Sequence, residues 1–538
     1  MFTLKNISYT HPDRTLLFDN IHLTVNPKEK IALIGNNGVG KSTLLKLIAG
    51  VLQPATGALT VDSKPYYVPQ IVGQFNELTI AQALGIDTKL NALSEILAGN
   101  VTEEYLTTLD DDWTIEERCR EALSLWKLDR LDLNQKMETL SGGQKTKVFL
   151  AGITIHQPEI VLLDEPSNHL DAESRELLYQ FIRKSPSAII VVSHDRTLLN
   201  QLDTMCEMSA HGIKTYGGNY DFYTEQKQIE NEAFKNNLLE KEKTLRKARK
   251  TEQEIKERQQ KLEARGSKQQ KKEGTGKAMM DKLKNDAENS SARIKGVHAE
   301  KTSGIAQELS ELRLQIPDKD KMKFGFDNSQ LHKGKILVTA TGINHGYGTP
   351  RNGNPEYENR SLWKQPLNFQ ITSGERIALK GQNGSGKTTL IKIMLGELTP
   401  KHGTISLADS KSVYIDQDYS LINNNLSVYE QAQTFNQSNL PEHEVKIRLN
   451  RFLFTNEFWD KSCQRLSGGE KMRLMLCCLT IANQAPDIIV LDEPTNNLDI
   501  QNIEILTEAI NDYQGTLIVV SHDDYFLKQI NIAKEFAL

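Results

Sequence analysis

Two stretches of the chain combine glycines, a lysine and hydroxyl residues in a spacing that suits the binding of phosphate groups. The first reads GNNGVGKST at residues 35–43 and the second reads GQNGSGKTT at residues 381–389. The first follows an apolar, strand-like run and opens a helix-like run, so backbone N–H groups and a helix N-terminus would surround the phosphates of a nucleotide. Lys41 would reach the β- and γ-phosphates. The residues predicted to bind ATP in the two stretches are Gly35, Asn36, Asn37, Gly38, Gly40, Lys41, Ser42, Thr43, Gly381, Gln382, Asn383, Gly384, Gly386, Lys387, Thr388 and Thr389.

An acidic pair ends an apolar run in each half of the chain, in IVLLDEP at 160–166 and IIVLDEP at 488–494. A carboxylate that leaves a buried strand beside a phosphate loop holds Mg²⁺ through water, and the loop hydroxyl would be a direct ligand. Glu165 lies one residue further out and is the candidate for polarising the attacking water, as is Glu493. The predicted Mg²⁺ ligands are Ser42, Gln70, Asp164, Thr388, Gln417 and Asp492.

Three further residue types are interpreted through their distance from these motifs. His194 and its repeat His522 end strand-like runs and are predicted to contact the γ-phosphate, although a single histidine at a strand end is usually structural. Gln70 follows a strand about thirty residues after the first loop and would sense the same phosphate. Tyr9 could stack on adenine or be a strand aromatic in a core, and the position that matches it in the second half is His345.

The pentapeptides LSGGQ at 140–144 and LSGGE at 466–470 complete a set that resembles the nucleotide-binding domain of ATP-binding cassette proteins. The resemblance implies an α/β fold with two tandem P-loop domains, each carrying a helical subdomain. It also implies that the signature of one domain caps the ATP held by the other, so the two domains would pack head to tail. Glycines let the signature backbone approach the γ-phosphate closely. The signature residues are Ser141, Gly142, Gly143, Gln144, Ser467, Gly468, Gly469 and Glu470.

The repeat is close but not perfect. The loop lysines are 346 residues apart and the signature serines 326, so the first copy carries about twenty extra residues, roughly 85–113. This insertion starts helix-like and ends in three aspartates. Two interpretations remain open: a slightly longer helical subdomain, or an arm that contacts another protein.

The composition is that of an ordinary soluble protein, with 38% hydrophobic and 25% charged residues among 538. The sequence contains neither a signal-peptide pattern nor an apolar run long enough to cross a membrane. Its five cysteines have no metal-ligand spacing and are predicted to be reduced, buried thiols of a cytosolic protein. The net charge of −5 hides a contrast: residues 241–300 hold 18 Lys and Arg against 10 Asp and Glu. That basic stretch is a localised electrostatic footprint.

The basic stretch lies in a middle segment at 221–333, between a first nucleotide-binding domain at 1–220 and a second at 334–538. A helix is expected to about residue 264, followed by a glycine- and lysine-rich tip at about 264–280 and a second helix to about 316. Leu245, Ile305, Leu309 and Leu312 contribute to apolar seams. An antiparallel helical hairpin is the favoured interpretation, and a partly disordered charged spacer is the alternative. Excess Lys and Arg at the tip suit contact with phosphates rather than with bases.

Two cassettes, no membrane domain and a charged helical linker that opens with GGNYDFY resemble the ABC-F family. The resemblance implies a cytoplasmic, monomeric ATPase that binds two ATP with Mg²⁺ and has no membrane partner. It would enter the tRNA exit site of the ribosome, and the basic tip would contact rRNA and the P-site tRNA near the peptidyl transferase centre. Such a protein regulates translation or protects it against antibiotics. The alternatives are a DNA-associated repair or transposon-excision ATPase and, more distantly, an ATP-binding subunit of a transporter.

Overall fold

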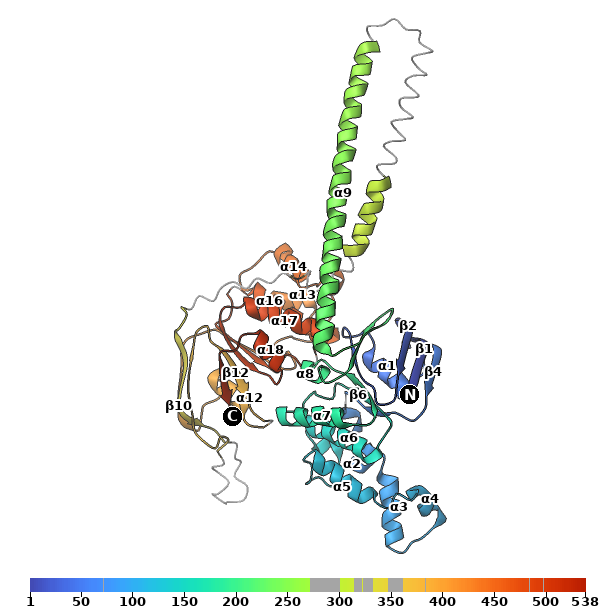
Figure 1. Ribbon diagram of the computed structural model, residues 1–538. Coiled ribbons are helices and arrows are strands. Elements are labelled where there is room, and N and C mark those ends of the chain that lie inside the picture. Colours follow the sequence, from blue (N-terminus) through green and yellow to red (C-terminus); the bar gives the residue numbers. More distant parts are fainter. Residues whose placement is uncertain are drawn as a thin grey trace. The chain divides into compact units, whose positions relative to one another are not determined.

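The computed structural model of the chain describes residues 1–70, 72–270, 300–313, 322, 332–346, 361–382, 384–482, 484–496 and 498–538. Side chains are described for all of these except 256, 259 and 262–270. Contacts between residues divide the chain into two units, Met1–Asp221 with Met322–Leu538, and Phe222–Lys321. The sequence-based boundaries are 220/221 and 333/334. The first unit contains two lobes of like construction, labelled in Figure 1.

A six-stranded sheet forms the centre of the first lobe, in the order β5-β6-β7-β3-β8-β9. Its strands pair in parallel except for the last two, which are antiparallel. The inner strands β6 and β7 are buried along their whole length, which explains their continuous apolar sequences. The strands are β3 Lys30–Ile34, β5 Tyr66–Val68, β6 Ile160–Asp164, β7 Ala188–Val192, β8 Thr204–Ser209 and β9 Gly212–Tyr216.

A second, antiparallel sheet of the first lobe has the order β2-β1-β4, with β1 Phe2–Thr10, β2 Leu16–Val25 and β4 Thr56–Val61. β2 and the next strand along the chain, β3, belong to different sheets. A turn divides them: the Asn26 N–H donates to Glu29 Oε2 at 2.9 Å, and Lys28 has a φ of +65°. This turn lets the chain pass from one sheet to the other.

Helices complete the first lobe, and the insertion at about 85–113 is helical. It contains all of α3 and α4, and α3 packs on α4 and contacts α2 and α5. The last of the three aspartates, Asp112, accepts a hydrogen bond from Arg118 at 2.7 Å, which lowers the pKa of that carboxyl. The helices are α1 Lys41–Ile48, α2 Ile80–Leu84, α3 Asp87–Leu97, α4 Glu103–Leu109, α5 Ile115–Leu125, α6 Gly142–His156, α7 Ala172–Lys184 and α8 Arg196–Leu199.

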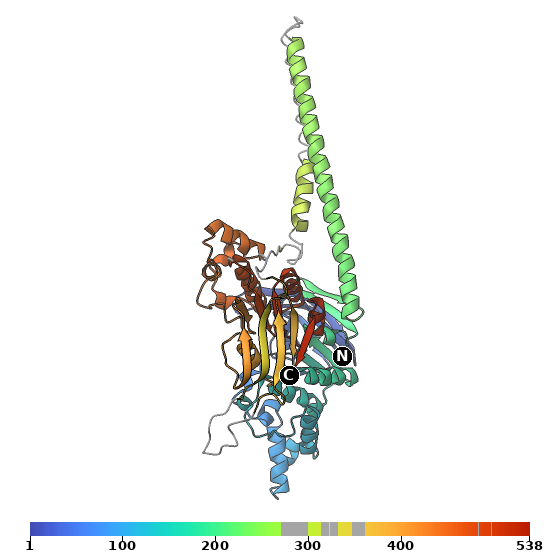
Figure 2. The same cartoon turned by 90° about the vertical axis from the view of Figure 1, so that its left-hand side faces the viewer.

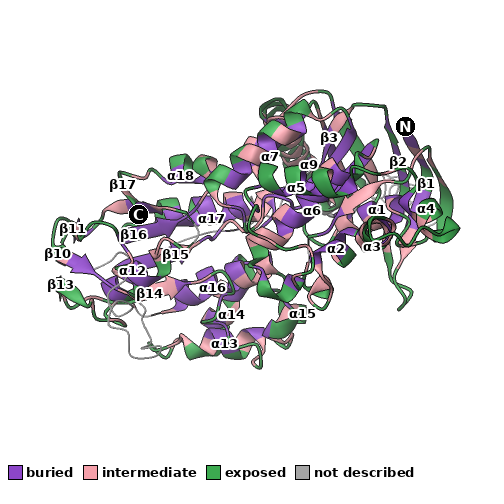
Figure 3. Ribbon diagram, turned by 90° about the horizontal axis from the view of Figure 1, so that it is seen from below, coloured by how far each residue is buried: buried purple, intermediate pink, exposed green. Residues whose placement is uncertain are grey.

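The second lobe repeats this plan with a parallel sheet in the order β14-β15-β16-β12-β17 and an antiparallel sheet in the order β11-β10-β13. Figure 2 shows strands of this lobe side by side, in yellow to red. Figure 3 shows in purple how deeply the inner strands and the faces of the helices are buried. The strands are β10 Ile336–Asn344, β11 Leu367–Thr372, β12 Arg376–Lys380, β13 His402–Leu407, β14 Ser412–Ile415, β15 Ile488–Asp492, β16 Thr516–Val520 and β17 Lys534–Ala537. The helices are α12 Lys387–Met394, α13 Val428–Thr434, α14 Glu442–Arg451, α15 Asn456–Trp459, α16 Gly468–Ile481, α17 Ile500–Asp512 and α18 Asp524–Gln529.

The unit at Phe222–Lys321 is dominated by α9, which begins in the first unit and spans Tyr220–Gln270. The expected end near residue 264 is wrong: the helix passes Gly266, because one glycine costs only about 1 kcal/mol and good helix formers follow it. Residues 300–313 are also helical and run antiparallel to α9, with Arg313 bonded to Glu242 at 2.6 Å and Thr302 to Glu252 at 3.3 Å. Leu309 is buried in the seam between them.

The rest of the basic tip, residues 271–280, and the expected second helix outside 300–313 lie outside the described residues. All five cysteines are buried and free. Within the part of the chain that the structure describes, none of the helices has both the length and the apolar character that a membrane span requires.

Candidate functional site

The first phosphate loop connects β3 to α1, and its lysine lies folded back on the loop. Lys41 Nζ donates to the carbonyl oxygens of Gly35 at 2.6 Å and Asn36 at 3.2 Å, and burial lowers its pKa. Gly40 has a φ of +103°, and a Cβ there would lie 2.7 Å from the Phe18 ring. Only glycine fits this position, which keeps the loop open for an anion. In the second loop, Lys387 Nζ donates in the same way to Gly381 O at 2.7 Å.

Asp164 ends β6 and is held by two hydroxyls. Ser42 Oγ donates to one carboxylate oxygen at 3.0 Å and the Tyr67 hydroxyl donates to the other at 3.1 Å. Burial raises the pKa of Asp164. In the second lobe the Tyr414 hydroxyl donates to Asp492 Oδ2 at 2.8 Å.

These two tyrosines are functional candidates that the sequence reasoning missed. Each stands three residues before the glutamine of its lobe, in YYVPQ and VYIDQ, and this shared Tyr-x-x-Gln spacing was a usable signal. Both glutamines are exposed, and Gln70 lines the cavity described below.

Glu165 and Glu493 follow their aspartates with an unusual backbone, because their φ angles are +51° and +49°. This left-handed turn costs about 1 kcal/mol for a residue with a Cβ, and it directs the side chain away from the strand end. Glu165 Oε1 lies 3.2 Å from His194 Nε2, and Glu493 Oε1 lies 3.4 Å from His522 Nε2. The same carboxylate–imidazole pair therefore recurs in both lobes, beyond the carboxyl ends of inner strands of the parallel sheet.

Burial decides the protonation of these pairs. It raises the pKa of Glu165 to about 8 and that of Glu493 to about 7, and it lowers the pKa of both histidines, to about 4 for His522. A carboxyl group that titrates near neutrality can accept a proton from water, and a neutral imidazole can donate a hydrogen bond to a phosphate oxygen. The pairs therefore suit general-base chemistry on a water molecule.

The first site is completed by residues of the second lobe. A cavity of about 420 Å³ is lined by phosphate-loop residues, Gln70, Asp164, Glu165 and His194, and also by Ser467 of the second signature. The backbone N–H of Asn37 donates to Asp499 Oδ2 across the lobes at 2.7 Å. The lobes thus meet head to tail at this site.

Each signature begins a helix, and its serine is the helix N-cap. Ser141 Oγ accepts the Gln144 N–H at 3.3 Å while Gln144 Oε1 accepts the Ser141 N–H at 2.9 Å. Ser467 and Glu470 exchange the same two bonds at the start of α16. The change from Gln to Glu at 470 therefore keeps this capping box. A Cβ at Gly143 would lie 2.6 Å from a backbone oxygen, so the close approach needs glycine.

The two sites differ in the charge that the opposite lobe supplies. Arg175 of α7 is buried, and its positive charge acts against the burial that raises the pKa of Glu493. The position 328 residues further along the chain, which corresponds to Arg175, is Ile503. Arg175 was not singled out from the sequence, because its role depends on the packing of one lobe against the other.

The remaining predicted residues are placed as follows. Tyr9 contacts His11 edge to face and Phe18 in a tilted arrangement, with ring centroids 5.7 and 6.2 Å apart, and the lining of the first cavity contains His11 rather than Tyr9. His345 directly follows the last residue of β10, Asn344, as Tyr9 follows Ser8 in β1; Asn344 pairs with β13 as Ser8 pairs with β4. Thr388 and Gln382 are exposed, and Asn383 lies outside the described residues.

These features fit ATP with Mg²⁺. In each loop the lysine ammonium group donates to carbonyl oxygens of the loop itself, and phosphate oxygens would replace these. Ser42 with Asp164, and Thr388 with Asp492, would hold the ion, which would screen the charge of the γ-phosphate. Glu493 Oε2 is buried without a hydrogen-bond partner in the described structure, so this oxygen could accept a hydrogen bond from a water molecule.

Comparison with known proteins agrees with this geometry. The model of the family described as ABC transporter matches residues 18–168 and 364–496, just over half of the chain. The chain belongs to this family. The expectation of two tandem cassettes with an α/β fold is confirmed, and this ABC protein is an ATPase that binds ATP.

The relatives that match over nearly the whole chain include proteins named as members of an F family. ABC transporter F family member 5 of Arabidopsis thaliana is 29% identical over 98% of this chain and 73% of its own length. The Energy-dependent translational throttle protein EttA of Mycobacterium tuberculosis is 29% identical over 98% of this chain and 89% of its own. Among solved structures, a complex of the archaeal ribosomal stalk protein aP1 and the archaeal ribosome recycling factor aABCE1 matches with a TM-score of 0.58 and 20% identity, over 98% of this chain and 86% of that one. This last likeness concerns the fold alone.

Proposed function

We propose that this protein is a cytoplasmic ATPase of the ribosome that closes its two lobes on two ATP molecules and uses the closure to position the segment that begins with α9. The observation that carries the proposal is the convergence of residues from both lobes on Asp221, at the start of that helix. The name of the relative EttA, which refers to translation, supports the same cellular process.

Two residues meet at Asp221, one from each lobe. Each of them follows, a few residues later in the chain, the histidine that is predicted to contact the γ-phosphate in its lobe. Asn200 follows α8, six residues after His194, and Tyr525 lies in α18, three residues after His522. Asn200 Nδ2 donates to Asp221 Oδ1 at 3.1 Å and to the Tyr525 hydroxyl at 2.5 Å. The Asp221 N–H donates back to Asn200 Oδ1 at 3.0 Å, and the Tyr525 hydroxyl lies 3.5 Å from Asp221 Oδ1. These three residues are called the helix junction below.

The helix junction gives lobe closure a route to α9. Each ATP would be ligated by the phosphate loop of one lobe and the signature of the other, so its γ-phosphate stabilises only the closed form. Movement of the two segments that contain His194 and His522 would then shift Asn200 relative to Tyr525. Asp221 would move as well, because it contacts both residues. Hydrolysis removes the phosphate contacts and with them the bias toward closure.

The finer assignments follow the resemblance to the ABC-F family. The protein would occupy the tRNA exit site of the ribosome as a monomer, with Mg²⁺ at both ATP sites, and the basic tip at about 264–280 would contact rRNA and the P-site tRNA. Its effect would be to regulate translation or to protect the ribosome from antibiotics that act there.

Ribosome pelleting with the double variant Glu165→Gln, Glu493→Gln tests the proposal. Because both bases are removed while ATP binding is kept, we expect this variant to sediment with ribosomes in ATP and to remain in the supernatant in ADP. A variant that stays free of ribosomes at low salt in ATP would overturn the proposal.

A second experiment tests the helix junction. Asn200→Ala with Tyr525→Phe removes all four hydrogen bonds of the junction, and neither residue touches the nucleotide cavity. We expect ATP hydrolysis in the absence of ribosomes to stay within about twofold of the parent, and the effect on an in vitro translation reaction to be lost. Gln201→Ala is the matched control, because the side-chain amide of Gln201 bonds to Arg183 and to the Thr197 carbonyl rather than to the helix junction. An unchanged effect on translation in the double variant would show that the junction transmits nothing.

A further inference from the structure

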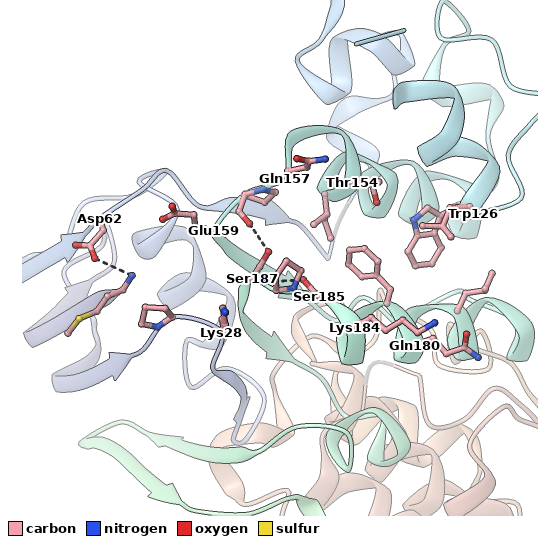
Figure 4. A pocket seen from close by; sticks show the side chains of 18 residues that line it. Lys28, Asp62, Trp126, Thr154, Gln157, Glu159, Gln180, Lys184, Ser185 and Ser187 are labelled. Carbon is pink, nitrogen blue, oxygen red and sulfur yellow. Dashed lines mark hydrogen bonds and ion pairs between the residues drawn. The ribbon is translucent and has the colours of Figure 1, made fainter. Parts of the chain in front are cut away.

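A cavity of about 860 Å³ lies in the first lobe, away from the phosphate loop (Figure 4). It is bordered by the C-terminal ends of α6 and α7 and by the turns that precede β3, β6 and β7. Its walls are mostly apolar and include Trp126, Ile153, Leu177 and Phe181. The volume is in the range of sites that hold small organic molecules.

Two buried polar atoms on this cavity have no hydrogen-bond partner in the described structure. They are Trp126 Nε1, on a side chain that is 1% exposed, and Thr154 Oγ1. Figure 4 shows both side chains on the same side of the cavity, across from Gln180 and Lys184 of α7. A buried polar group without a partner costs about 1–3 kcal/mol and is uncommon in a stable fold. Two of them on one cavity indicate a site whose partner atoms come from a bound molecule.

At the corresponding positions of the second lobe, a polar side chain is either hydrogen-bonded within the chain or replaced by an apolar one. Thr480, which occupies the position of Thr154 in α16, donates to the Cys477 carbonyl at 2.7 Å. The position of Trp126 is held by Phe452, which has no polar atom and is buried in the core of that lobe. Trp363, another buried tryptophan, donates to Ser385 O at 3.0 Å. The unpaired atoms are therefore a property of the first lobe.

The second lobe also shows what kind of group fills the equivalent space. After α17, Tyr513 turns inward, is 2% exposed, and its hydroxyl donates to the Pro486 carbonyl at 2.6 Å. The residue at this place after α7 is Ser185, and the equivalent carbonyl, that of Pro158, accepts instead from Ser187 Oγ at 2.6 Å. An aromatic ring that is part of the chain in the second lobe is thus missing from the first.

We propose that this first-lobe cavity is a binding site for a small, planar aromatic molecule that carries a hydrogen-bond acceptor. The ring would lie against Trp126 and Phe181, whose own rings are 5.9 Å apart, and the acceptor would be bonded by the indole N–H with Thr154 as a second partner. Both polar atoms are shielded from solvent, so side chains at the cavity wall turn aside when the ligand enters. Side-chain rotations of this kind are fast on the time scale of binding.

The site stands at the far ends of two helices that serve the ATP sites. α6 begins at the first signature, and α7 begins at the N-cap Asp171, whose charge acts on Lys387. A ligand that bridges Ile153 and Thr154 of α6 to Phe181 of α7 would constrain the angle between these helices. The site itself does not depend on the ribosomal function proposed above.

The test uses the full-length protein labelled with ¹⁵N-tryptophan and two matched probes, quinoline-6-sulfonate and naphthalene-2-sulfonate. The probes have the same shape, and only the first carries a ring acceptor. The chain has four tryptophans, so the indole resonance of Trp126 is identified by its loss in Trp126→Phe. We expect the quinoline probe to shift this resonance with a Kd of about 1 mM, as is usual for a molecule of this size, and to bind about three- to tenfold more tightly than the naphthalene probe.

Two variants decide whether the shift reports this cavity. Ser185→Tyr with Ser187→Gly transfers the second-lobe arrangement, so it should fill the cavity and weaken both probes at least tenfold. Thr154→Val keeps the shape and the fold but removes the hydroxyl, and it should reduce the preference for the quinoline probe. Equal binding to the filled variant, an unchanged Trp126 resonance in the wild type, or an unchanged preference in Thr154→Val would overturn the proposal.

Discussion

Replacing Asp499 by Asn tests whether the two lobes share each ATP site through specific atoms. Asp499 has two tasks: its Oδ1 accepts the Asn502 N–H at 2.8 Å as the N-cap of α17, and its Oδ2 accepts the Asn37 N–H of the first phosphate loop at 2.7 Å. Asparagine is as good an N-cap as aspartate, so the helix keeps its start. The amide nitrogen would then face the Asn37 N–H, which removes an acceptor and the negative charge near Lys41.

The magnitude follows from the bond that is lost. A hydrogen bond to a charged group contributes about 1.5–3 kcal/mol, and each 1.4 kcal/mol corresponds to about a factor of ten. We therefore expect Asp499→Asn to lower kcat/KM for ATP at the first site by about 10- to 100-fold. Thermal unfolding should be almost unchanged because the N-cap is preserved.

The assay isolates one site at a time. In a Glu493→Gln background only the first site can turn over, and in a Glu165→Gln background only the second. Asp171→Asn is the matched variant, because Asp171 caps α7 in the same way and its charge acts on Lys387 and His522 of the second site. Each substitution should lower kcat/KM most at the site whose phosphate-loop lysine lies near the substituted aspartate. Equal losses at both sites for both variants would refute the reasoning and show that these aspartates act only on closure as a whole.

Two further predictions concern the carboxylates of the sites. Tyr414→Phe removes the hydroxyl that bonds Asp492 at 2.8 Å, so the Mg²⁺ concentration for half-maximal hydrolysis at the second site should rise about three- to tenfold, measured by Mg²⁺ titration in the Glu165→Gln background. An unchanged Mg²⁺ requirement would exclude a positioning role for this tyrosine. The second prediction concerns pH: a general base must be ionised, so turnover falls as the pH drops through the pKa of the base. Burial raises the pKa of Glu165 to about 8 and that of Glu493 to about 7. The acid limb of the pH–rate profile should therefore lie at higher pH for the first site than for the second. The pH–rate profiles in the two single-site backgrounds test this order, and a reversed order would contradict it.

The parts of the site that the sequence predicts are those formed by neighbouring residues. The phosphate loops, the Asp-Glu pairs and the signatures each lie within one strand-to-loop or loop-to-helix segment, so their local pattern carries their chemistry. The fold class is confirmed for the same reason: strands that are buried on both faces have continuous apolar sequences, as β6 and β7 do.

What the sequence could not predict depends on contacts between distant segments. The bond from Asn37 to Asp499 joins residues 462 positions apart, and the helix junction joins Asn200 to Tyr525. No local pattern specifies such pairs, because they follow from the packing of one lobe on the other. Tyr67 and Tyr414 are an intermediate case, since their spacing from Gln70 and Gln417 repeats but their hydroxyl partners do not show in the sequence.

The tyrosine that fills the second lobe has a consequence for how the two halves diverged. A Cβ at position 515 would collide with the Tyr513 ring, 2.9 Å from Cε2 and closer still to the hydroxyl end, so Tyr513 requires Gly515. In the first lobe the corresponding pair is Ser185 and Ser187, and both side chains fit. Starting from a serine pair, tyrosine could be accepted only after glycine, and starting from the tyrosine pair, glycine could be replaced only after tyrosine was lost. A change from one arrangement to the other therefore needs two substitutions in a fixed order. The wrong order passes through a chain in which the tyrosine ring collides with a Cβ at the second position.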